Sequence, residues 1–289
     1  MAIFYYCKSA KLHLCSKTLG CTEEDYEKLK EKGKITKEHI EMLFLLQKYR
    51  ALTDTMLSDL MGADKRYVHQ ELEKLSEYGL VIKQFYEGER FETNARTETF
   101  YCAGLHLPKE TVNENKMNDF TWSREIKIED IMAILSFNQF HIALTSYVPK
   151  KALQAQTCYN VRHVCVDGRY RLKSSKFQMG YSHLFVISVR DFAERNVQLT
   201  EKLKAIKEYY SYSAEKMPWF VLLCENRNQC CRLNKRIHEN PDLSDVLVYY
   251  LLDTDIAKGE NPLYVLQTYH FANKEQEIES KIFCVKDWY

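Results

Sequence analysis

Three short segments of helical periodicity, each preceded by a capping residue, constrain the fold of this chain more than any other feature. Thr36, Thr53 and Asp64 each stand just before apolar residues at helical spacing. A threonine or aspartate side chain at such a position accepts hydrogen bonds from the first free backbone N–H groups of a helix. Gly62 and Gly79 follow the second and third segments, where glycine readily adopts the left-handed conformation that ends a helix. The pattern predicts three successive short helices.

A β-hairpin is predicted directly after the third helix. Residues 80–82 form a short apolar run, Glu87-Gly88-Glu89 is typical of a turn, and residues 97–102 indicate a returning strand. Three short helices followed by a hairpin is the element order of a winged helix-turn-helix. We therefore expect a winged helix-turn-helix domain over residues 36–107.

The third helix of such a fold enters the major groove of DNA through its N-terminal half. With Val68, Leu72 and Leu75 facing the core, the polar side chains of this helix point outward. Arginine and glutamine suit base edges, and lysine suits phosphate groups. The expected residues for contact with double-stranded DNA are Lys65, Arg66, His69 and Gln70 on this helix, with Arg90, Asn94 and Arg96 at the tip of the wing.

A protein-contact role for this domain stays open, because its charge does not favour DNA. Residues 34–107 carry ten basic and twelve acidic side chains. Affinity for DNA depends largely on neutralisation of phosphate charge, so an acidic module binds weakly unless it dimerises or gains cations from elsewhere. An interaction module whose winged helix touches no DNA is therefore the alternative to a DNA-binding domain.

The remaining segments predict a two-domain organisation. Residues 1–35 are interpreted as an N-terminal arm, and residues 108–121, which are rich in asparagine and lack an apolar period, as a linker. Residues 122–289 predict an α/β domain with a mixed central sheet. Its expected elements are a helix over 129–147, a strand over 157–166, a turn at Asp167-Gly168, strands over 169–173 and 183–189, a helix over 193–212, a strand over 219–224, a helix through Leu233 and Ile237, and strands over 246–251 and 263–269.

Several sequence phrases carry a resemblance to a known family. Residues 72–81 (LEKLSEYGLV) match the exit from a recognition helix, Val166-Asp167-Gly168-Arg169 stands where that family has a P-D-G/A hairpin, and residues 218–223 (PWFVLL) match a later buried strand. Over residues 36–235 the chain resembles the replication-relaxation family of bacterial plasmids and integrative elements, which joins a winged helix to a domain like the PD-(D/E)xK nucleases. The resemblance implies a cytoplasmic DNA-binding protein that regulates transcription, replication or transfer of a mobile element.

The nuclease chemistry of such a fold needs an aspartate on the hairpin and a second acidic residue on the third strand, which together hold Mg²⁺. Asp167 stands at the first position, but residues 183–190 contain no carboxylate. We therefore expect a nuclease-like domain without enzymatic activity. A magnesium-dependent DNA nuclease that uses Asp167 with Asp191 and Glu129 is the alternative.

The one concentration of positive charge lies in residues 149–180, which carry seven basic side chains and a single acid, Asp167. Such a group attracts an anionic partner. In a protein that we expect to be a homodimer, auxiliary phosphate contacts are predicted for Lys150, Lys151, Arg169, Arg171, Lys173 and Lys176. A hairpin with solvated cations is the alternative interpretation.

Composition and motifs argue against several other classes of protein. The chain has ten cysteines but no CxxC pair, so neither a structural zinc site nor a disulfide scaffold is expected. Its apolar runs have strand length, so we expect no membrane span and no secretory signal. The sequence contains no glycine motif for phosphate or dinucleotide binding. We expect a soluble protein without a metal or cofactor.

Overall fold

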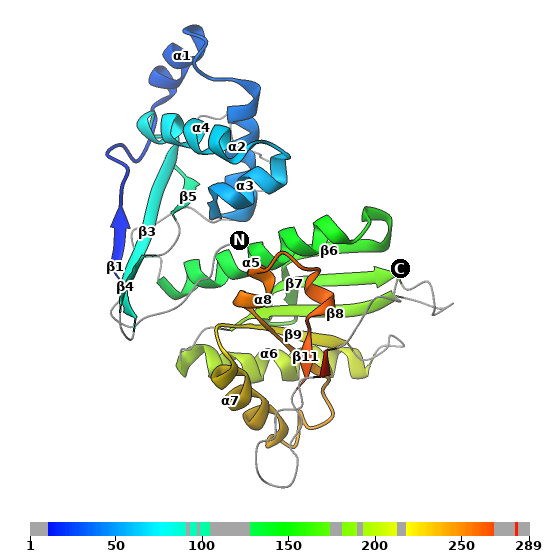
Figure 1. The fold of residues 1–289 in the computed structure, drawn as a ribbon. Coiled ribbons are helices and arrows are strands. Elements are labelled where there is room, and N and C mark those ends of the chain that lie inside the picture. The colour runs from blue at the N-terminus through cyan, green and yellow to red at the C-terminus, as the bar shows by residue number, and fades with distance from the viewer. Residues whose placement is uncertain are drawn as a thin grey trace. The chain divides into compact units, whose positions relative to one another are not determined.

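The computed structural model describes residues 11–90, 93–96, 99–104, 128–173, 181–189, 193–212, 218–268 and 281–282. The chain divides between Asn138 and Gln139 into two compact units (Figure 1). Each unit combines helices with a β-sheet, so the fold is mixed α+β. Within the described ranges, no helix is both long and apolar enough to cross a lipid bilayer.

The N-terminal unit places short helices beside a small antiparallel sheet. Its helices include α1 (Glu23–Glu31), α2 (Lys37–Tyr49), α3 (Asp54–Met61) and α4 (Lys65–Glu77). Its strands are β1 (Lys11–Leu14), β2 (Leu52–Thr53), β3 (Val81–Arg90), β4 (Thr93–Arg96) and β5 (Phe100–Ala103). The sheet has the order β1-β3-β5-β2, and β4 also pairs with β3. Strand β1 was not expected, because we interpreted the segment that contains it as an arm.

The expected N-terminal capping residues begin the three helices α2, α3 and α4. The side chains of Thr36, Thr53 and Asp64 accept backbone N–H groups in the first turn of each helix. Gly62 follows α3 in the left-handed conformation with a φ of 62°. The apolar stripes of these helices form the core of the unit, which includes the fully buried Leu43, Leu46, Leu57, Val68, Leu72 and Leu75.

The predicted turn at Glu87-Gly88-Glu89 is wrong. Strand β3 continues through Gly88, which pairs with Ala95, and its last residue Arg90 pairs with Thr93 of β4. The two strands therefore reverse direction between residues 90 and 93. Gly88, the residue on which the predicted turn depends, lies inside a strand.

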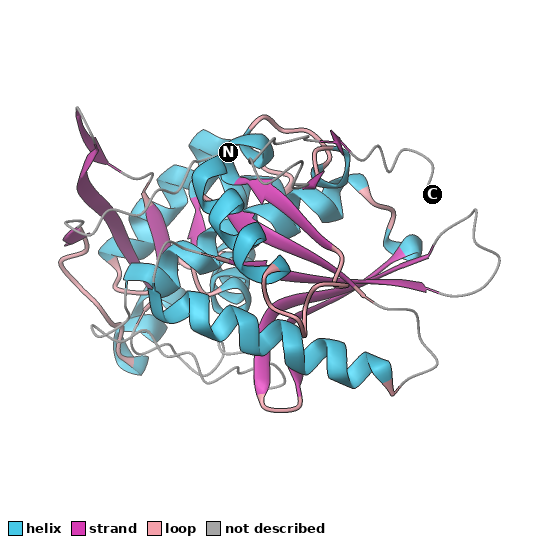
Figure 2. Ribbon diagram, turned by 90° about the horizontal axis from the view of Figure 1, so that it is seen from below, coloured by secondary structure: helices cyan, strands magenta, loops and turns pink. Residues whose placement is uncertain are grey.

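The C-terminal unit is built on a mixed sheet (Figure 2, strands in magenta). In the described residues its strand order is β12-β11-β10-β9-β8-β7-β6. Strands β8, β9 and β10 are parallel, and the other pairs are antiparallel. The strands are β6 (Leu153–Val161), β7 (Val164–Lys173), β8 (Tyr181–Ser188), β9 (Trp219–Cys224), β10 (Val248–Leu252), β11 (Gln267–Thr268) and β12 (Lys281–Ile282).

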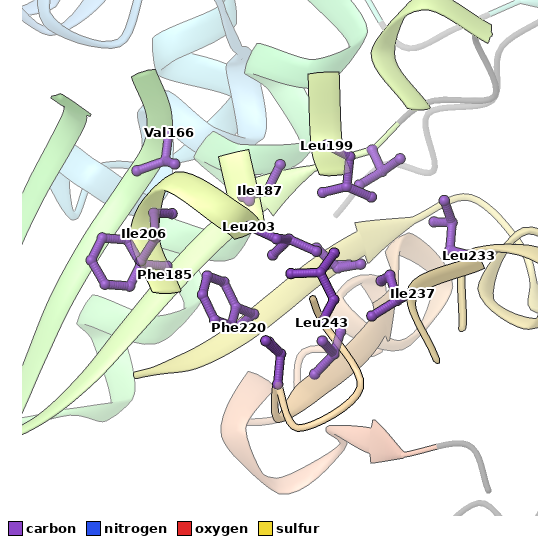
Figure 3. Close-up of a cluster of buried hydrophobic side chains, with 14 of the residues drawn as sticks. Val166, Phe185, Ile187, Leu199, Leu203, Ile206, Phe220, Leu233, Ile237 and Leu243 are labelled. Carbon is purple, nitrogen blue, oxygen red and sulfur yellow. The ribbon is translucent and has the colours of Figure 1, made fainter. Parts of the chain in front are cut away.

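Helices cover both faces of this sheet. They are α5 (Ile128–Tyr147), which contains the boundary between the units, α6 (Ala193–Ser211), α7 (Arg227–His238) and the short α8 (Asp253–Ala257), with 3₁₀ turns at Lys150–Ala152 and Pro262–Tyr264. On one face, Phe140 of α5 packs edge-on against Tyr170 of β7. On the other face, α6 and α7 cover Phe185 and Phe220 of the central strands, and the cluster includes Leu199, Leu203, Ile206, Leu233 and Ile237 (Figure 3).

The predicted hairpin turn at Asp167-Gly168 is also wrong. Val161 pairs with Val164, so the chain reverses at Arg162 and His163. Both residues of the predicted turn lie inside β7, where Gly168 pairs with Val186 of β8. One of the phrases that carried the family resemblance therefore has a different local structure from the hairpin expected there.

Candidate nucleic-acid interface

Helix α4 exposes the N-terminal half of its outer face. Val68, Leu72 and Leu75 are fully buried, as their spacing predicted. The side chains between them point away from the core, because residues three or four apart share one face of a helix. Exposed in the first two turns are Lys65, Arg66, Tyr67, His69 and Gln70. The structure thus brings the four polar residues predicted for this helix onto one accessible surface, which we call the α4 surface.

One carboxylate contacts two of the predicted DNA-contact residues. Asp54, the first residue of α3, places Oδ1 3.3 Å from Nζ of Lys65 and Oδ2 3.2 Å from Nδ1 of His69. The Lys65 and His69 side chains remain 52% and 46% exposed. The Asp54 side chain is only 14% exposed, so drawing Lys65 and His69 toward another anion would leave a largely buried carboxylate with fewer partners. The carboxylate also lowers the positive potential of the α4 surface.

Arg66 and Gln70 lie one helical turn apart and form the outermost part of the α4 surface. In the described part of the chain, neither side chain forms an ion pair or a hydrogen bond. Their backbone is fixed at the start of the helix, because Asp64 Oδ1 accepts the N–H groups of Arg66 and Tyr67 at 2.9 and 3.1 Å. A guanidinium and an amide at this spacing can reach adjacent base edges or phosphates.

Further along α4, Glu73 is held by two neighbouring strands. Its Oε1 accepts a hydrogen bond from the Tyr101 hydroxyl at 3.1 Å and lies 2.6 Å from Nζ of Lys83. Burial and the adjacent charge of Glu73 raise the pKa of Tyr101 far above its ordinary value, so this hydroxyl stays protonated and donates. Glu73 Oε1 also lies 3.9 Å from Nε2 of His69. The imidazole of His69 therefore stands between two carboxylates.

A buried pair anchors α4 to α2. Glu71 Oε2 lies 2.6 Å from Nε2 of His39, and Nδ1 of this histidine accepts the backbone N–H of Thr36 at 3.2 Å. Because Nδ1 accepts, Nε2 carries the proton that is donated to Glu71. Burial raises the pKa of Glu71, but the hydrogen bonds from Lys74 and His39 outweigh it, so the pKa lies below its ordinary value. The carboxylate thus fixes the rotation of α4 from its inner side.

The predicted wing residues lie on β3 and β4, next to the point where these strands reverse. Arg90 is the last residue of β3, Asn94 pairs with Glu89, and Arg96 pairs with Glu87. Their side chains lie outside the described residues.

In the C-terminal unit, the predicted basic residues fall into two groups. Lys150 and Lys151 precede β6, Lys173 ends β7, and all three are exposed. Because Leu153 pairs with Leu172, these lysines gather at one end of the β6–β7 hairpin. Lys176 lies outside the described residues.

The two hairpin arginines predicted to contact phosphate, Arg169 and Arg171, are held by neighbouring side chains. Arg169 donates to the Tyr159 hydroxyl at 2.8 Å and to Nδ1 of the buried His183 at 3.0 Å, and its guanidinium stacks over the Tyr159 ring. Arg171 donates to Oε1 of Gln154 at 3.4 Å. Both are partly buried. These contacts make Arg169 a structural residue of the sheet and leave less of its guanidinium for phosphate.

The residues of the nuclease alternative do not form a described metal centre. Asp167 Oδ2 accepts the backbone N–H of Ser188 at 2.7 Å, at the point where the β7–β8 ladder ends. Asp191 and the side chain of Glu129 lie outside the described residues. Where side chains are described, no three His, Cys, Asp or Glu residues gather closely enough to hold a metal ion.

The sequence did not predict two buried carboxylates that follow parallel strands. Glu225 follows β9 and is 5% exposed, and Asp253 follows β10 and is fully buried. Both stand at the carboxyl ends of parallel strands, where α/β sheets commonly bind ligands. An acidic residue directly after a two-sided apolar strand is the sequence signal that could have found them.

Comparison with known proteins gave no match to a family model, a curated protein or a solved structure. The resemblance to the replication-relaxation family therefore stays a prediction.

Proposed function

We propose that the N-terminal unit is a winged helix-turn-helix that binds double-stranded DNA through the α4 surface. The observation that carries the proposal is the exposure of Lys65, Arg66, His69 and Gln70 on a helix whose other side is fixed in the core. A helix that binds in the major groove must expose the polar side chains of its N-terminal half, while contacts on its inner side fix its orientation. The buried Glu71–His39 pair supplies that support on α4.

Each exposed residue has a separate role in this proposal. Arg66 and Gln70, which have no partner in the described part of the chain, contact base edges or phosphates. Lys65 and His69 exchange their contacts with Asp54 for contacts with phosphate. Because Asp54 competes for these two side chains, we expect modest affinity with a strong dependence on salt. Regulation of transcription, replication or transfer of a mobile element rests on the resemblance alone.

Binding of the full chain to a random-sequence duplex, measured by fluorescence anisotropy between about 50 and 200 mM salt, tests this proposal. We expect a log–log slope of several, which Arg66→Ala lowers by about one. Lys235→Ala removes an exposed lysine from α7 of the C-terminal unit and serves as the control. A slope that is the same in wild type and Arg66→Ala would contradict contact by α4.

A protein-interaction module is the second candidate. It is favoured by the pairing of Lys65 and His69 with Asp54 and by the excess of acidic residues over residues 34–107. This candidate predicts no measurable binding to duplex even at low salt.

A further inference from the structure

We propose that the edge strand β6 joins two copies of this chain through antiparallel pairing about Ala155. Strand β6 ends the strand order of the sheet in the C-terminal unit, so one side of its backbone has no neighbouring strand in the described residues. The side chains of Gln154, Ala155 and Gln156 are exposed along it. The inference does not depend on the proposed binding of DNA.

Strand β6 lacks the residues that usually prevent an edge strand from pairing with another chain. Proteins that remain monomeric block long edge strands with lysine, proline, bulges or inward-pointing charges. The nine residues of Leu153–Val161 (LQAQTCYNV) contain no charged residue, no proline and no glycine. The exposed side chains of this strand therefore carry no charge, and no proline ring blocks pairing with a second strand.

The backbone of β6 limits where a second strand can pair. Cys158 has a φ of 50°, and the ladder to β7 lacks a bridge at this residue, between Thr157 and Tyr159. A positive φ at a non-glycine residue disturbs regular pairing. The regular part of the free edge is therefore Leu153–Thr157, and its centre is Ala155.

A second copy fits this segment by symmetry. A two-fold axis at Ala155 places Gln154 opposite Gln156 of the partner subunit, and Leu153 opposite Thr157 of the partner subunit. All of these pairs are neutral, so no like charges face each other across the interface. The small side chain of Ala155 allows close approach at the axis.

The surrounding charge is compatible with the same arrangement. The exposed lysines of the hairpin, Lys150, Lys151 and Lys173, gather where β6 begins. Antiparallel strands begin at opposite ends of their interface, so the two lysine groups stay apart. At the other end of the strand, Arg162 is neutralised by Glu208 of α6.

Two double variants test the strand and its register together. Gln154→Lys with Gln156→Lys places lysine opposite lysine at two symmetric positions, whereas Gln154→Lys with Gln156→Glu places lysine opposite glutamate. The original side chains are exposed, and both variants lose the same contact between Gln154 and Arg171, so we expect the two variants to fold alike, which circular dichroism checks.

Sedimentation equilibrium of the full chain over a range of concentrations gives the dimer dissociation constant. We expect a dimer for wild type and for the lysine–glutamate variant. In the lysine–lysine variant we expect the dissociation constant to rise about tenfold. A wild-type chain that stays monomeric at every concentration overturns the proposal, and so do equal dissociation constants for the two variants.

Discussion

Glu71 and Glu73 lie two residues apart on α4 and hold this helix in different ways. Glu71 points inward and pairs with His39, whereas Glu73 joins the hydroxyl of Tyr101 and the ammonium group of Lys83. Both carboxylates therefore fix α4 against neighbouring elements. Each carboxylate has an adjacent hydrogen-bond donor. Its repulsion of a DNA phosphate would therefore be weaker than that of an isolated carboxylate.

Replacing Glu71 tests how strongly the inner side of α4 is anchored. Glu71→Ala leaves the buried Nε2–H of His39 without its acceptor, so we expect the free energy of unfolding to fall by about 2 kcal/mol. Urea denaturation measures this change. Glu77→Ala removes an exposed carboxylate from the same helix and should change stability by less than about 0.5 kcal/mol. Equal effects of the two substitutions would show that the pair does not anchor α4.

The same carboxylate predicts a pH dependence of stability. The folded pKa of Glu71 lies below its ordinary value, so its charge stabilises the fold above an unfolded pKa of about 4.3. This contribution is lost as the pH falls through the lower folded pKa. We expect the difference in unfolding free energy between wild type and Glu71→Gln to shrink as the pH is lowered below about 4.3. A difference that stays constant down to acid unfolding would contradict the assignment.

Asp54 gives a prediction that separates the two proposed functions. Asp54→Asn removes the carboxylate that pairs with Lys65 and His69, while the side chain keeps its size. If the α4 surface binds DNA, affinity for random duplex at low salt should rise several-fold, because less charge repels phosphate. Asp242→Asn, which removes an exposed carboxylate from the C-terminal unit, serves as the control in the same anisotropy assay. Unchanged affinity in Asp54→Asn would contradict contact of the α4 surface with phosphate, and the absence of binding in both proteins would favour the interaction module.

At the scale of single elements, the turn after α4 depends on close backbone contact. Gly79 has a φ of 75°, and a Cβ atom placed there would lie 2.5 Å from the carbonyl oxygen of Gly20. Gly62, after α3, has a φ of 62°, but no atom lies within 4 Å of the Cβ position. The two glycines share a conformation and differ in the space beside them.

These two glycines form a matched pair of substitutions. Gly62→Ala adds only the strain of a left-handed conformation, so we expect a loss of about 1 kcal/mol in the free energy of unfolding. Gly79→Ala adds the same strain and forces the Gly20 segment away, so its loss should be clearly larger. Thermal unfolding of both variants makes the comparison. Similar losses would show that the contact beside Gly79 is easily relieved.

Helix boundaries were predictable because capping is a local signal. Thr36, Thr53, Asp64 and Gly62 occupy the positions expected for them. The two wrong turns share one cause, because Gly88 and Gly168 lie inside paired strands. Whether a glycine ends a strand or continues it depends on the strand that pairs beside it, and pairing between distant residues leaves no local pattern.

The candidate site was predictable only where it depends on a local sequence pattern. Helical periodicity identified which residues of α4 face outward, since burial of Val68, Leu72 and Leu75 fixes the rotation of the helix. The partner that holds Lys65 and His69 comes from α3, and the contacts of Arg169 come from β6 and β8. Such contacts depend on tertiary packing, so no spacing in the sequence revealed them.

At the scale of the whole molecule, net charge does not favour the proposed binding of DNA. The chain carries 41 basic and 40 acidic side chains, so any binding must come from the local arrangement of charge. A dimer through β6 would carry two α4 surfaces and two groups of hairpin lysines. Doubling the phosphate contacts would offset the acidic excess near α4.

Photo-cross-linking from α4 tests the central claim most directly. A benzoylphenylalanine replaces Gln70 on the α4 surface in one variant and the exposed Glu27 of α1 in a second. After irradiation with random duplex at low salt, we predict cross-linked DNA from position 70 and much less from position 27. No cross-link from position 70, or equal yields from both positions, would contradict a role for α4 in binding DNA.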